Sequence, residues 1–292
     1  MKAAIFGRNF DLEHKKHIQS FFDKLYSFGI EVLIFNKFHQ FLTSEADISL
    51  QSCQTFSNYI GLKGKSEVLF SIGGDGTILD ALNVVRDSNI PVIGINTGKL
   101  GFLASVAIHE TGQAIEAIVS KQFIIDKRSL LKVESDFGIF KDFPFCLNEI
   151  TVQKSDATMI TVQVEIDGEY LNTYWADGLI VSTPTGSTAY SLSVGGPVVT
   201  PQSESLVISS ISPHNLTIRP LVLPDNCKLK LRVQSRAQNY IVSLDHRSIK
   251  IDNKEEICVS KADFSLNLIQ LNNSSFYKTI RNKLMWGADK RN

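Results

Sequence analysis

The first hundred residues alternate short apolar runs with segments of helical spacing, and this alternation restricts the possible folds most. Four runs are typical of buried strands: residues 2–7, 30–35, 67–72 and 91–96. Apolar side chains recur with the period of a helix in residues 18–25 and 77–86. Strands that alternate with helices form parallel βαβ units. We therefore expect an open parallel sheet with helices packed on both of its faces.

The second half of the chain has the spacing of strands. After a helix-like segment at 114–119, strand-like runs follow at 123–133, 146–153, 160–166, 229–233, 240–244 and 256–259. Asp167-Gly168 has the turn chemistry of a hairpin. Apolar residues at 276, 280 and 284 predict a last helix. We expect two domains: an α/β domain over residues 1–105 and a β-rich, sandwich-like domain over 106–265.

The charge and composition exclude several classes of partner. Thirty basic residues balance thirty acidic ones, so no net field attracts the chain to nucleic acid or to a membrane surface. No run reaches the roughly 18 apolar residues of a membrane-spanning helix, and the amino terminus lacks a signal-peptide pattern. The cysteines at 53, 146, 227 and 258 form no C-x-x-C pair, which favours free thiols over disulfides or zinc.

A glycine-rich loop, Gly73-Gly74-Asp75-Gly76-Thr77, follows the third predicted strand and precedes a helix. Glycines let the main chain approach a ligand closely, and the free amides at a helix start favour phosphate. Ligands of open α/β sheets bind where this loop lies, at the carboxyl ends of the strands. Asp75 could accept a hydroxyl proton or help hold a metal. The alternative is a plain turn in which Asp75 bonds to local amides and Thr77 is the N-cap.

A second glycine-rich loop leaves the next predicted strand, with the sequence GINTGKLGFL at residues 94–103. Because the carboxyl ends of neighbouring parallel strands meet at one edge of the sheet, the two loops should converge on one crevice. Ordinary turns rarely need this much glycine twice in succession. The pair of loops therefore favours a binding site over two plain turns.

The motifs of this chain occur in the order of those in NAD kinases, and the chain resembles that family over nearly its whole length. They are GGDGT at 73–77, GINTGKLGFL at 94–103, DKRSLL at 126–131, Asn148-Glu149, DGLIVSTPTGSTAY at 177–190, PHNLTIRPLVLP at 213–224 and the closing FYKTIRNKLMWG. GGDGT alone also occurs in lipid kinases and phosphofructokinases, but its combination with TPTGSTAY is highly specific. The resemblance implies transfer of the terminal phosphoryl group of ATP to the adenosine-ribose 2′-hydroxyl of NAD, giving NADP.

The resemblance also implies roles for individual residues. Asp75 matches the catalytic aspartate, the base that takes the proton from the ribose hydroxyl. The other matches are expected to contact the nucleotides: Gly74, Gly76, Phe102, Asn148, Glu149, Asp177 on the nicotinamide side, and Thr188, Ala189, Tyr190 and Ser193 lining the NAD pocket. No protein side chain is assigned as a metal ligand.

Further expectations concern the cofactor, the assembly and the end of the chain. The resemblance implies ATP as the phosphoryl donor and Mg²⁺, or another divalent cation, as the cofactor. It implies a cytoplasmic homo-oligomer, a dimer or a tetramer, whose substrates are the small molecules NAD and ATP. It also implies that residues from about 266 to 292, including the last helix, return to complete the first domain.

Two positions depart from the family pattern. Trp175 and Asp80 stand where basic residues are common. We expect the corresponding phosphate contacts to be lost or to come from other residues, such as Arg247.

Three alternatives remain beside this interpretation. A lipid kinase would share GGDGT but needs an acyl-chain pocket, of which the sequence gives no sign. A non-catalytic NAD sensor would bind dinucleotide without making NADP. Gly64-Lys65-Ser66 resembles the end of a Walker motif, yet it precedes a strand, whereas a P-loop follows one, so we interpret it as a surface loop.

Overall fold

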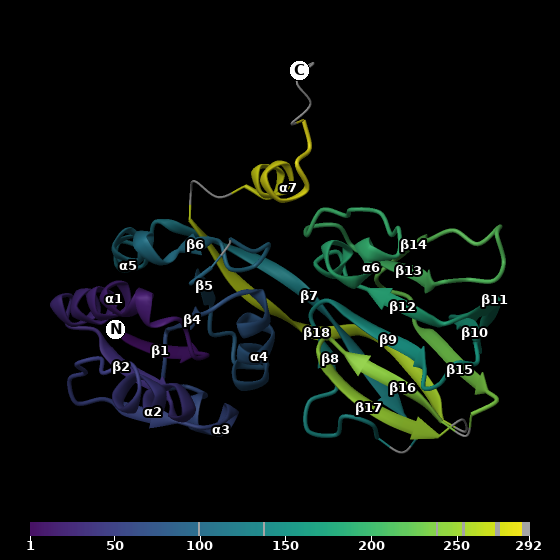
Figure 1. Ribbon diagram of the computed structural model, residues 1–292, viewed down its shortest axis with the longest axis horizontal. Helices are drawn as coiled ribbons and strands as arrows, with labels where there is room; N and C mark the ends of the chain where they lie inside the picture. Colours follow the sequence, from purple (N-terminus) through teal and green to yellow (C-terminus); the bar gives the residue numbers. More distant parts are fainter. Residues whose placement is uncertain (99, 137, 238, 253–254, 272–274, 288–292) are drawn as a thin grey trace. The chain divides into compact units, whose positions relative to one another are not determined.

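The chain forms two compact units, shown in Figure 1. The structure is a computed structural model that describes residues 1–98, 100–136, 138–237, 239–252, 255–271 and 275–287. The first unit comprises Met1–Lys127 and the chain from Leu266 onward, and the second comprises Arg128–Ser265. Strands β7 (Phe123–Ser135) and β18 (Glu256–Leu271) contribute residues to both units. The predicted domain boundary near residue 105 stays a prediction.

The first unit is built on a parallel sheet with the strand order β5-β4-β1-β2-β3. Its strands are β1 (Lys2–Gly7), β2 (Glu31–Phe35), β3 (Gln54–Phe56), β4 (Val68–Ile72) and β5 (Val92–Asn96), and the short β6 (Val106–Ala107) pairs with β5. In register, Gly7 pairs with Ile72, and Ile72 pairs with Ile95. The strands β1, β4 and β5 therefore end at one edge of the sheet, and the loops that follow them begin there.

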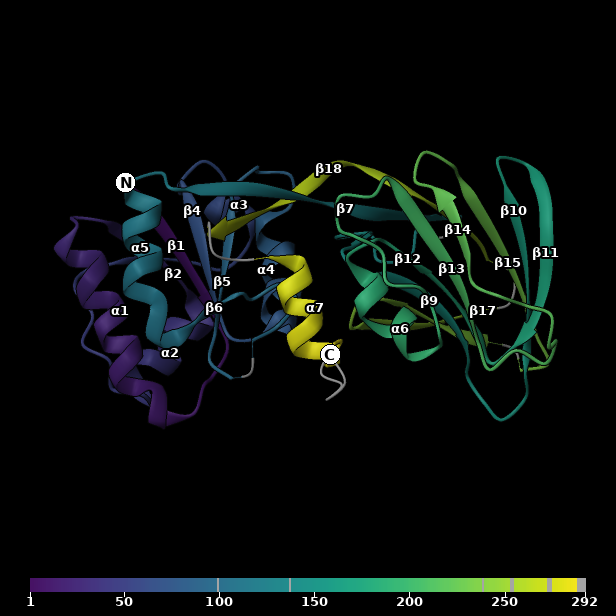
Figure 2. The same ribbon diagram turned by 90° about the horizontal axis from the view of Figure 1, so that it is seen from above.

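Helices cover both faces of this sheet, as Figure 2 shows from a second direction. The first unit contains α1 (Lys15–Ser27), α2 (Asn36–Ser44), α3 (Tyr59–Leu62), α4 (Asp75–Val85), α5 (Thr111–Val119) and α7 (Phe276–Leu284), with 3₁₀ turns at Leu12–His14 and Ile108–Glu110. In the described part of the chain, no helix is both long and apolar enough to cross a membrane.

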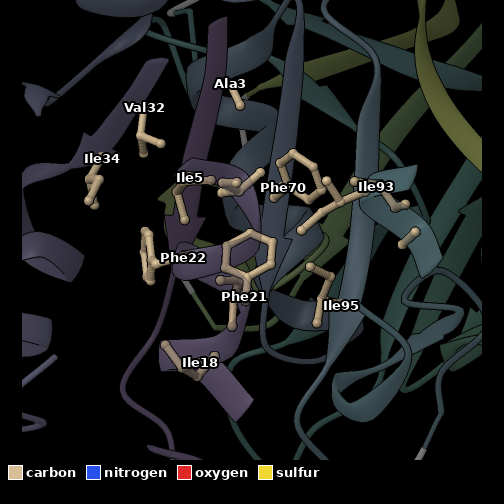
Figure 3. Packing of buried hydrophobic residues seen from close by; sticks show 14 of the residues in the cluster. Ala3, Ile5, Ile18, Phe21, Phe22, Val32, Ile34, Phe70, Ile93 and Ile95 are labelled. Carbon is tan, nitrogen blue, oxygen red and sulfur yellow. The ribbon is translucent and has the colours of Figure 1, made fainter. Parts of the chain in front are cut away.

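One face of the sheet packs on α1 and α5 through a large apolar cluster (Figure 3). Ile93 and Ile95 belong to this cluster, and Phe21 of α1 packs edge-on against Phe70 with ring centroids 5.2 Å apart. Because side chains alternate along a strand, Gly94 faces the opposite side, toward α4. A Cβ on Gly94 would lie 2.6 Å from Ile78 of α4, so glycine permits this close packing. The helix that follows the GGDGT loop is thereby held tightly on the sheet.

The second unit is an antiparallel β sandwich. One sheet has the order β14-β13-β12-β9-β16-β17, and strands β11, β10, β15 and β18 pair in that order in the other. The strands are β8 (Phe145–Cys146), β9 (Glu149–Lys154), β10 (Ile160–Ile166), β11 (Glu169–Ala176), β12 (Gly178–Ser182), β13 (Ser205–Ile211), β14 (Leu221–Pro224), β15 (Leu229–Ser235), β16 (Asn239–Leu244) and β17 (Arg247–Asp252). A 3₁₀ turn at Gly186–Thr188 and α6 (Tyr190–Ser193) interrupt the strands. Apolar side chains from both sheets form one core.

The end of the chain belongs to the first unit, which confirms the predicted return. Leu268 of β18 pairs in parallel with Val92 of β5. Further on, α7 and the residues around 100–106 line a pocket of about 650 Å³. The parallel α/β sheet and the antiparallel β-rich sandwich are likewise confirmed.

Several elements differ from the sequence-based expectations. Helix α2 was not expected from the sequence, although it buries Phe38, Phe41 and Leu42. Helix α4 begins at Asp75 and not at residue 77. Strand β18 continues to Leu271, well past the predicted end at 259. Polar residues such as Lys261 and Asp263 interrupt its apolar pattern because that stretch of the strand is only partly buried.

We expect Phe70→Ala to destabilise the first unit strongly. Phe70 is fully buried against Phe21, and truncation of a buried phenylalanine typically costs about 3–5 kcal/mol. Phe28→Ala is the matched control, since Phe28 is 42% exposed and its loss should change the free energy of unfolding by less than about 1 kcal/mol. Urea unfolding measures both variants, and equal effects would contradict the packing described here.

Candidate functional site

The GGDGT loop forms the link between β4 and α4. Gly73 has φ +148°, and a Cβ there would lie 2.1 Å from the hydroxyl oxygen of Thr77. Only glycine therefore fits the turn. Gly74 is the N-cap residue, so the interpretation of Thr77 as N-cap is wrong. Among the described residues, none lies within 4 Å of the position that a Cβ would take on Gly74.

Asp75 lies in the first turn of α4, and its carboxylate accepts three hydrogen bonds from consecutive main-chain amides. The amide of Phe102 donates to Oδ2 at 2.8 Å. The amides of Leu103 and Ala104 donate to Oδ1 at 3.1 and 2.8 Å. The plain-turn alternative placed Asp75 on local amides, but these donors lie 27 to 29 residues further along the chain. Asp75 thus ties the GGDGT loop to the loop that follows β5.

This contact requires glycine at position 101. A Cβ on Gly101 would lie 1.8 Å from Oδ1 of Asp75, which is closer than any real contact. The amide of Gly101 donates to the carbonyl of Ala104 at 3.1 Å, which closes a tight turn around the carboxylate. Lys99, in the same loop, lies outside the described residues. The two glycine-rich loops therefore converge, as expected, and their meeting point is the Asp75 carboxylate.

The carboxylate of Asp75 keeps one site for a further hydrogen bond. Each carboxylate oxygen has two acceptor positions. Oδ1 uses both of them for Leu103 and Ala104, whereas Oδ2 uses one for Phe102. Asp75 is only partly buried. Oδ2 is therefore the atom that can accept a hydrogen bond from a ligand.

In the second unit, Asn148 and Glu149 lie at the start of β9, and a carboxylate that the sequence analysis missed positions them. Asp245 accepts the amides of Leu147 at 3.0 Å, Asn148 at 2.7 Å and Glu149 at 3.3 Å. The amide of Asp245 donates in return to the carbonyl of Glu149 at 3.0 Å. Asp245 has φ +54° in the turn between β16 and β17. A two-residue turn that joins two strands was the only signal in the sequence for this position.

The TPTGSTAY segment packs directly on the same stretch. The hydroxyl of Thr183 donates to the carbonyl of Leu147 at 2.6 Å, and the amide of Thr183 donates to the carbonyl of Asn148 at 2.9 Å. A Cβ on Gly186 would lie 2.1 Å from the carbonyl oxygen of Asn148, so glycine is required there. The structure thus brings the Asn148-Glu149 pair together with the TPTGSTAY turn.

The side chains predicted after this turn are accessible to varying degrees. Thr188 and Ala189 are partly buried, whereas Tyr190 and Ser193 are exposed on α6. The hydroxyl of Tyr190 accepts a hydrogen bond of 3.1 Å from the side-chain amide of Gln153 on β9. These residues follow the turn that holds Asn148, so they lie on the same side of the sandwich.

Asp177 lies elsewhere in the second unit. It precedes β12, and Ser182 at the other end of this strand pairs with Glu149, so about 16 Å of strand separates Asp177 from that pair. Asp177 forms an ion pair of 2.7 Å with Lys154. Both line a pocket of about 630 Å³ together with Trp175, His214 and Arg236. Asp177 is thus distant from Glu149 but not from Tyr190, because Gln153, which bonds to the Tyr190 hydroxyl, pairs with Gly178 and precedes Lys154.

Arg247 contacts the segment before Asn148. Its guanidinium donates to the carbonyl of Phe143 at 2.8 Å and to that of Phe145, and it lies over the ring of Phe143. These contacts hold the segment before Asn148 against the β16–β17 hairpin. Arg247 thus supports that segment, and a phosphate contact by Arg247 stays a prediction.

Glu149 is a buried carboxyl group with an unusual pKa. Burial, followed by the nearby Asp245 carboxylate, raises its pKa to about 8, although a hydrogen bond from the main-chain amide of Tyr190 opposes the shift. Its Oε2 is buried and has no hydrogen-bond partner in the described part of the chain. A neutral carboxyl group can donate a hydrogen bond as well as accept one, and a ligand hydroxyl or amide can use both. Glu149 is therefore prepared for a polar ligand.

Glu149→Gln should flatten the dependence of stability on pH. The carboxyl group titrates near 4.5 in the unfolded chain and at about 8 in the folded one. Between these values the folded state binds more protons, so the free energy of unfolding of the wild type falls as pH rises, by up to about 1.4 kcal/mol per pH unit. Urea unfolding from about pH 5 to about pH 8 compares the two proteins. Parallel curves would show that Glu149 ionises normally.

Comparison with known proteins assigns these motifs to one family. The models of the ATP-NAD kinase N-terminal and C-terminal domains match residues 61–123 and 147–271. The NAD kinase of Flavobacterium psychrophilum is 46% identical and that of Cytophaga hutchinsonii 44% identical, each over the full length of both chains.

Solved structures agree with the fold. A yeast NADH kinase complexed with NADH superposes with a TM-score of 0.86 at 22% identity, covering 99% of this chain and 88% of that one. An NAD kinase from Archaeoglobus fulgidus in complex with ATP has a TM-score of 0.73 at 26% identity, covering 98% and 99%. Because full-length relatives and both domain models match, the chain belongs to the NAD kinase family.

Proposed function

We propose that the chain transfers the terminal phosphoryl group of ATP to the adenosine-ribose 2′-hydroxyl of NAD, with Asp75 as the base. The observation that supports the proposal most is the fixed position and the accessibility of the Asp75 carboxylate. It is fixed by three amides, it is partly exposed, and it has one acceptor position left on Oδ2. A base must lie in a defined position to accept a proton during the reaction.

The reaction needs little covalent work from the protein. As the 2′-oxygen of the ribose attacks the γ-phosphorus, the bond from that phosphorus to the leaving ADP oxygen breaks and the hydroxyl proton passes to Oδ2 of Asp75. The amides at the start of α4, beside Gly74, are the donors we assign to the triphosphate. Gly76 follows Asp75 in the chain, and the amide of Phe102 donates to the Asp75 carboxylate. We therefore assign both residues to contact with the adenosine ribose.

The dinucleotide contacts of the second unit form the other part of the proposal. We assign Asn148 and Glu149 to ribose or base atoms because both offer donors and acceptors at the end of a fixed strand. Thr188, Ala189, Tyr190 and Ser193 are assigned to the wall of the same pocket. Asp177 is assigned to the nicotinamide side.

We assign the divalent cation, Mg²⁺ in the simplest case, to the phosphates of ATP. Among the described residues, no group of three or more His, Cys, Asp or Glu side chains could hold a metal ion. Mg²⁺ commonly keeps several waters and binds through one or two carboxylates and the substrate phosphates. We therefore expect the cation to arrive bound to the triphosphate, where it would neutralise phosphate charge.

A cytoplasmic location and a dimer or tetramer also belong to this proposal. They are supported by membership of the family. The exposed side chain of Leu216, 88% accessible in the segment before β14, offers apolar area for a subunit contact.

A non-catalytic NAD sensor is the remaining alternative. The fixed carboxylate with a vacant acceptor position favours the enzyme, because binding alone does not need a base. Formation of NADP by the purified chain from NAD, ATP and Mg²⁺, detected with an NADP-specific dehydrogenase, tests the proposal. Dinucleotide binding without NADP under any phosphoryl donor would favour the sensor.

Asp75→Asn should lower kcat at least about a hundredfold, because the amide cannot take the proton. NAD should still bind, though more weakly, since asparagine leaves at least one of the three loop amides without an acceptor. Turnover at saturating NAD and ATP, together with calorimetric NAD binding, separates the two effects. A kcat within about tenfold of the wild type would remove Asp75 from this role.

Gly101→Ala should lower turnover at least about tenfold, although the variant still has the Asp75 carboxylate. The new Cβ would displace the Asp75 side chain or the loop around it. Gly98→Ala is the matched control in the same loop, because its Cβ would meet only Asn96 Oδ1 at an ordinary 3.7 Å. Steady-state NADP formation compares the variants. Full activity of Gly101→Ala would show that the position of the carboxylate is unimportant.

A further inference from the structure

The strand order of the first unit identifies two loops that border the phosphoryl-transfer site. In the order β5-β4-β1-β2-β3, the chain turns to one side after β1 and to the other side after β4. Ligands of open α/β sheets bind outside the carboxyl ends of the strands at such a switch point. One of the two loops is GGDGT. The other begins with Arg8, which directly follows β1.

Arg8 lies against the start of α4. Gly7 pairs with Ile72, and the amide of Arg8 donates to the carbonyl of Ile72 at 3.4 Å, which places Arg8 beside the first residue of the GGDGT loop. Its Nη1 lies 3.9 Å from the position that a Cβ would take on Gly76. The guanidinium is therefore next to the residue that follows Asp75.

Asp80, one turn further along α4, orients this guanidinium. Nε of Arg8 donates to Oδ2 of Asp80 at 2.5 Å, and Nη2 forms an ion pair with the same oxygen. These contacts use one edge of the guanidinium, and Nη1 faces the GGDGT loop. The side chain of Arg8 is 54% exposed, whereas that of Asp80 is 23% exposed. The pair therefore presents its cationic member to solvent.

This arrangement solves an electrostatic problem of the site. Asp75 and Asp80 place two carboxylates on the first turns of α4, where the proposed function brings the triphosphate. Arg8 neutralises the charge of Asp80 through the ion pair, and its Nη1 still faces the GGDGT loop. Planar guanidinium groups with a free edge are well suited to phosphate oxygens. An exposed ion pair of this kind contributes little to folding stability, so stability does not explain it.

We propose that Arg8, held by Asp80, binds phosphate oxygens of the substrates at the GGDGT loop. The proposal rests on the proposed function and adds to it a residue outside the recognised motifs. The phosphates can be those of the triphosphate donor or the pyrophosphate of NAD, which share the same chemistry.

The test compares Arg8→Ala and Arg8→Gln with the wild type in NADP formation. Either variant should raise the KM for ATP or for NAD at least about tenfold. A rise for ATP assigns Arg8 to the donor, and a rise for NAD assigns it to the pyrophosphate. The melting temperature should remain unchanged. If Arg8→Ala folds poorly, Arg8→Gln, which retains a donor for Asp80, decides the question.

Lys2→Ala is the matched control. Lys2 lies at the opposite end of β1 and forms an exposed ion pair with Glu31 at 3.0 Å, so its loss changes the net charge equally without touching the site. The exchange Arg8→Asp with Asp80→Arg should recover part of the substrate affinity that Arg8→Asp alone loses. Both KM values within twofold of the wild type, or a change confined to kcat, would overturn the proposal. An inactive wild type would instead contradict the proposed function.

Discussion

The hydrogen bonds from three consecutive amides to the Asp75 carboxylate are the contact on which the site of the first unit depends. They join the loop after β4 to the loop after β5 and fix the orientation of the acidic side chain. The glycines at 73, 94 and 101 serve this contact, because each allows an approach that a Cβ would block. Gly94 lets α4 pack closely on the sheet, and Gly101 lets the second loop close around the carboxylate.

The second unit uses the same device. Asp245 accepts hydrogen bonds from the amides of Leu147, Asn148 and Glu149, so a carboxylate again fixes a segment of proposed binding residues through its main chain. The surroundings differ, however. Burial raises the pKa of Asp245 although the three amides oppose the shift, and the enclosed carboxylate raises the pKa of Glu149 in turn. Asp75, by contrast, stays partly open to a ligand. One carboxylate is therefore enclosed and positions the main chain before β9, whereas the other stays accessible and is the proposed base.

The sequence contained enough to predict the parallel sheet, the change to antiparallel strands and the two glycine-rich loops, because these depend on apolar period and on glycine. It could not show what Asp75 or Asp245 bonds to. Their donors are main-chain amides, which every residue except proline has, and they lie 27 to 98 residues away. The sequence could not show the pairing of Arg8 with Asp80 either, because the two residues lie 72 positions apart in the chain. Asp80 stood out only as a departure from a family pattern.

The most direct test of the account is a structure of the enzyme with NAD bound. We expect the adenosine-ribose 2′-oxygen to lie about 3 Å from Oδ2 of Asp75. The three hydrogen bonds from main-chain amides to this carboxylate should persist. A ribose whose 2′-oxygen lies more than about 5 Å from both carboxylate oxygens, with the loop at residues 101–104 unchanged, would contradict it.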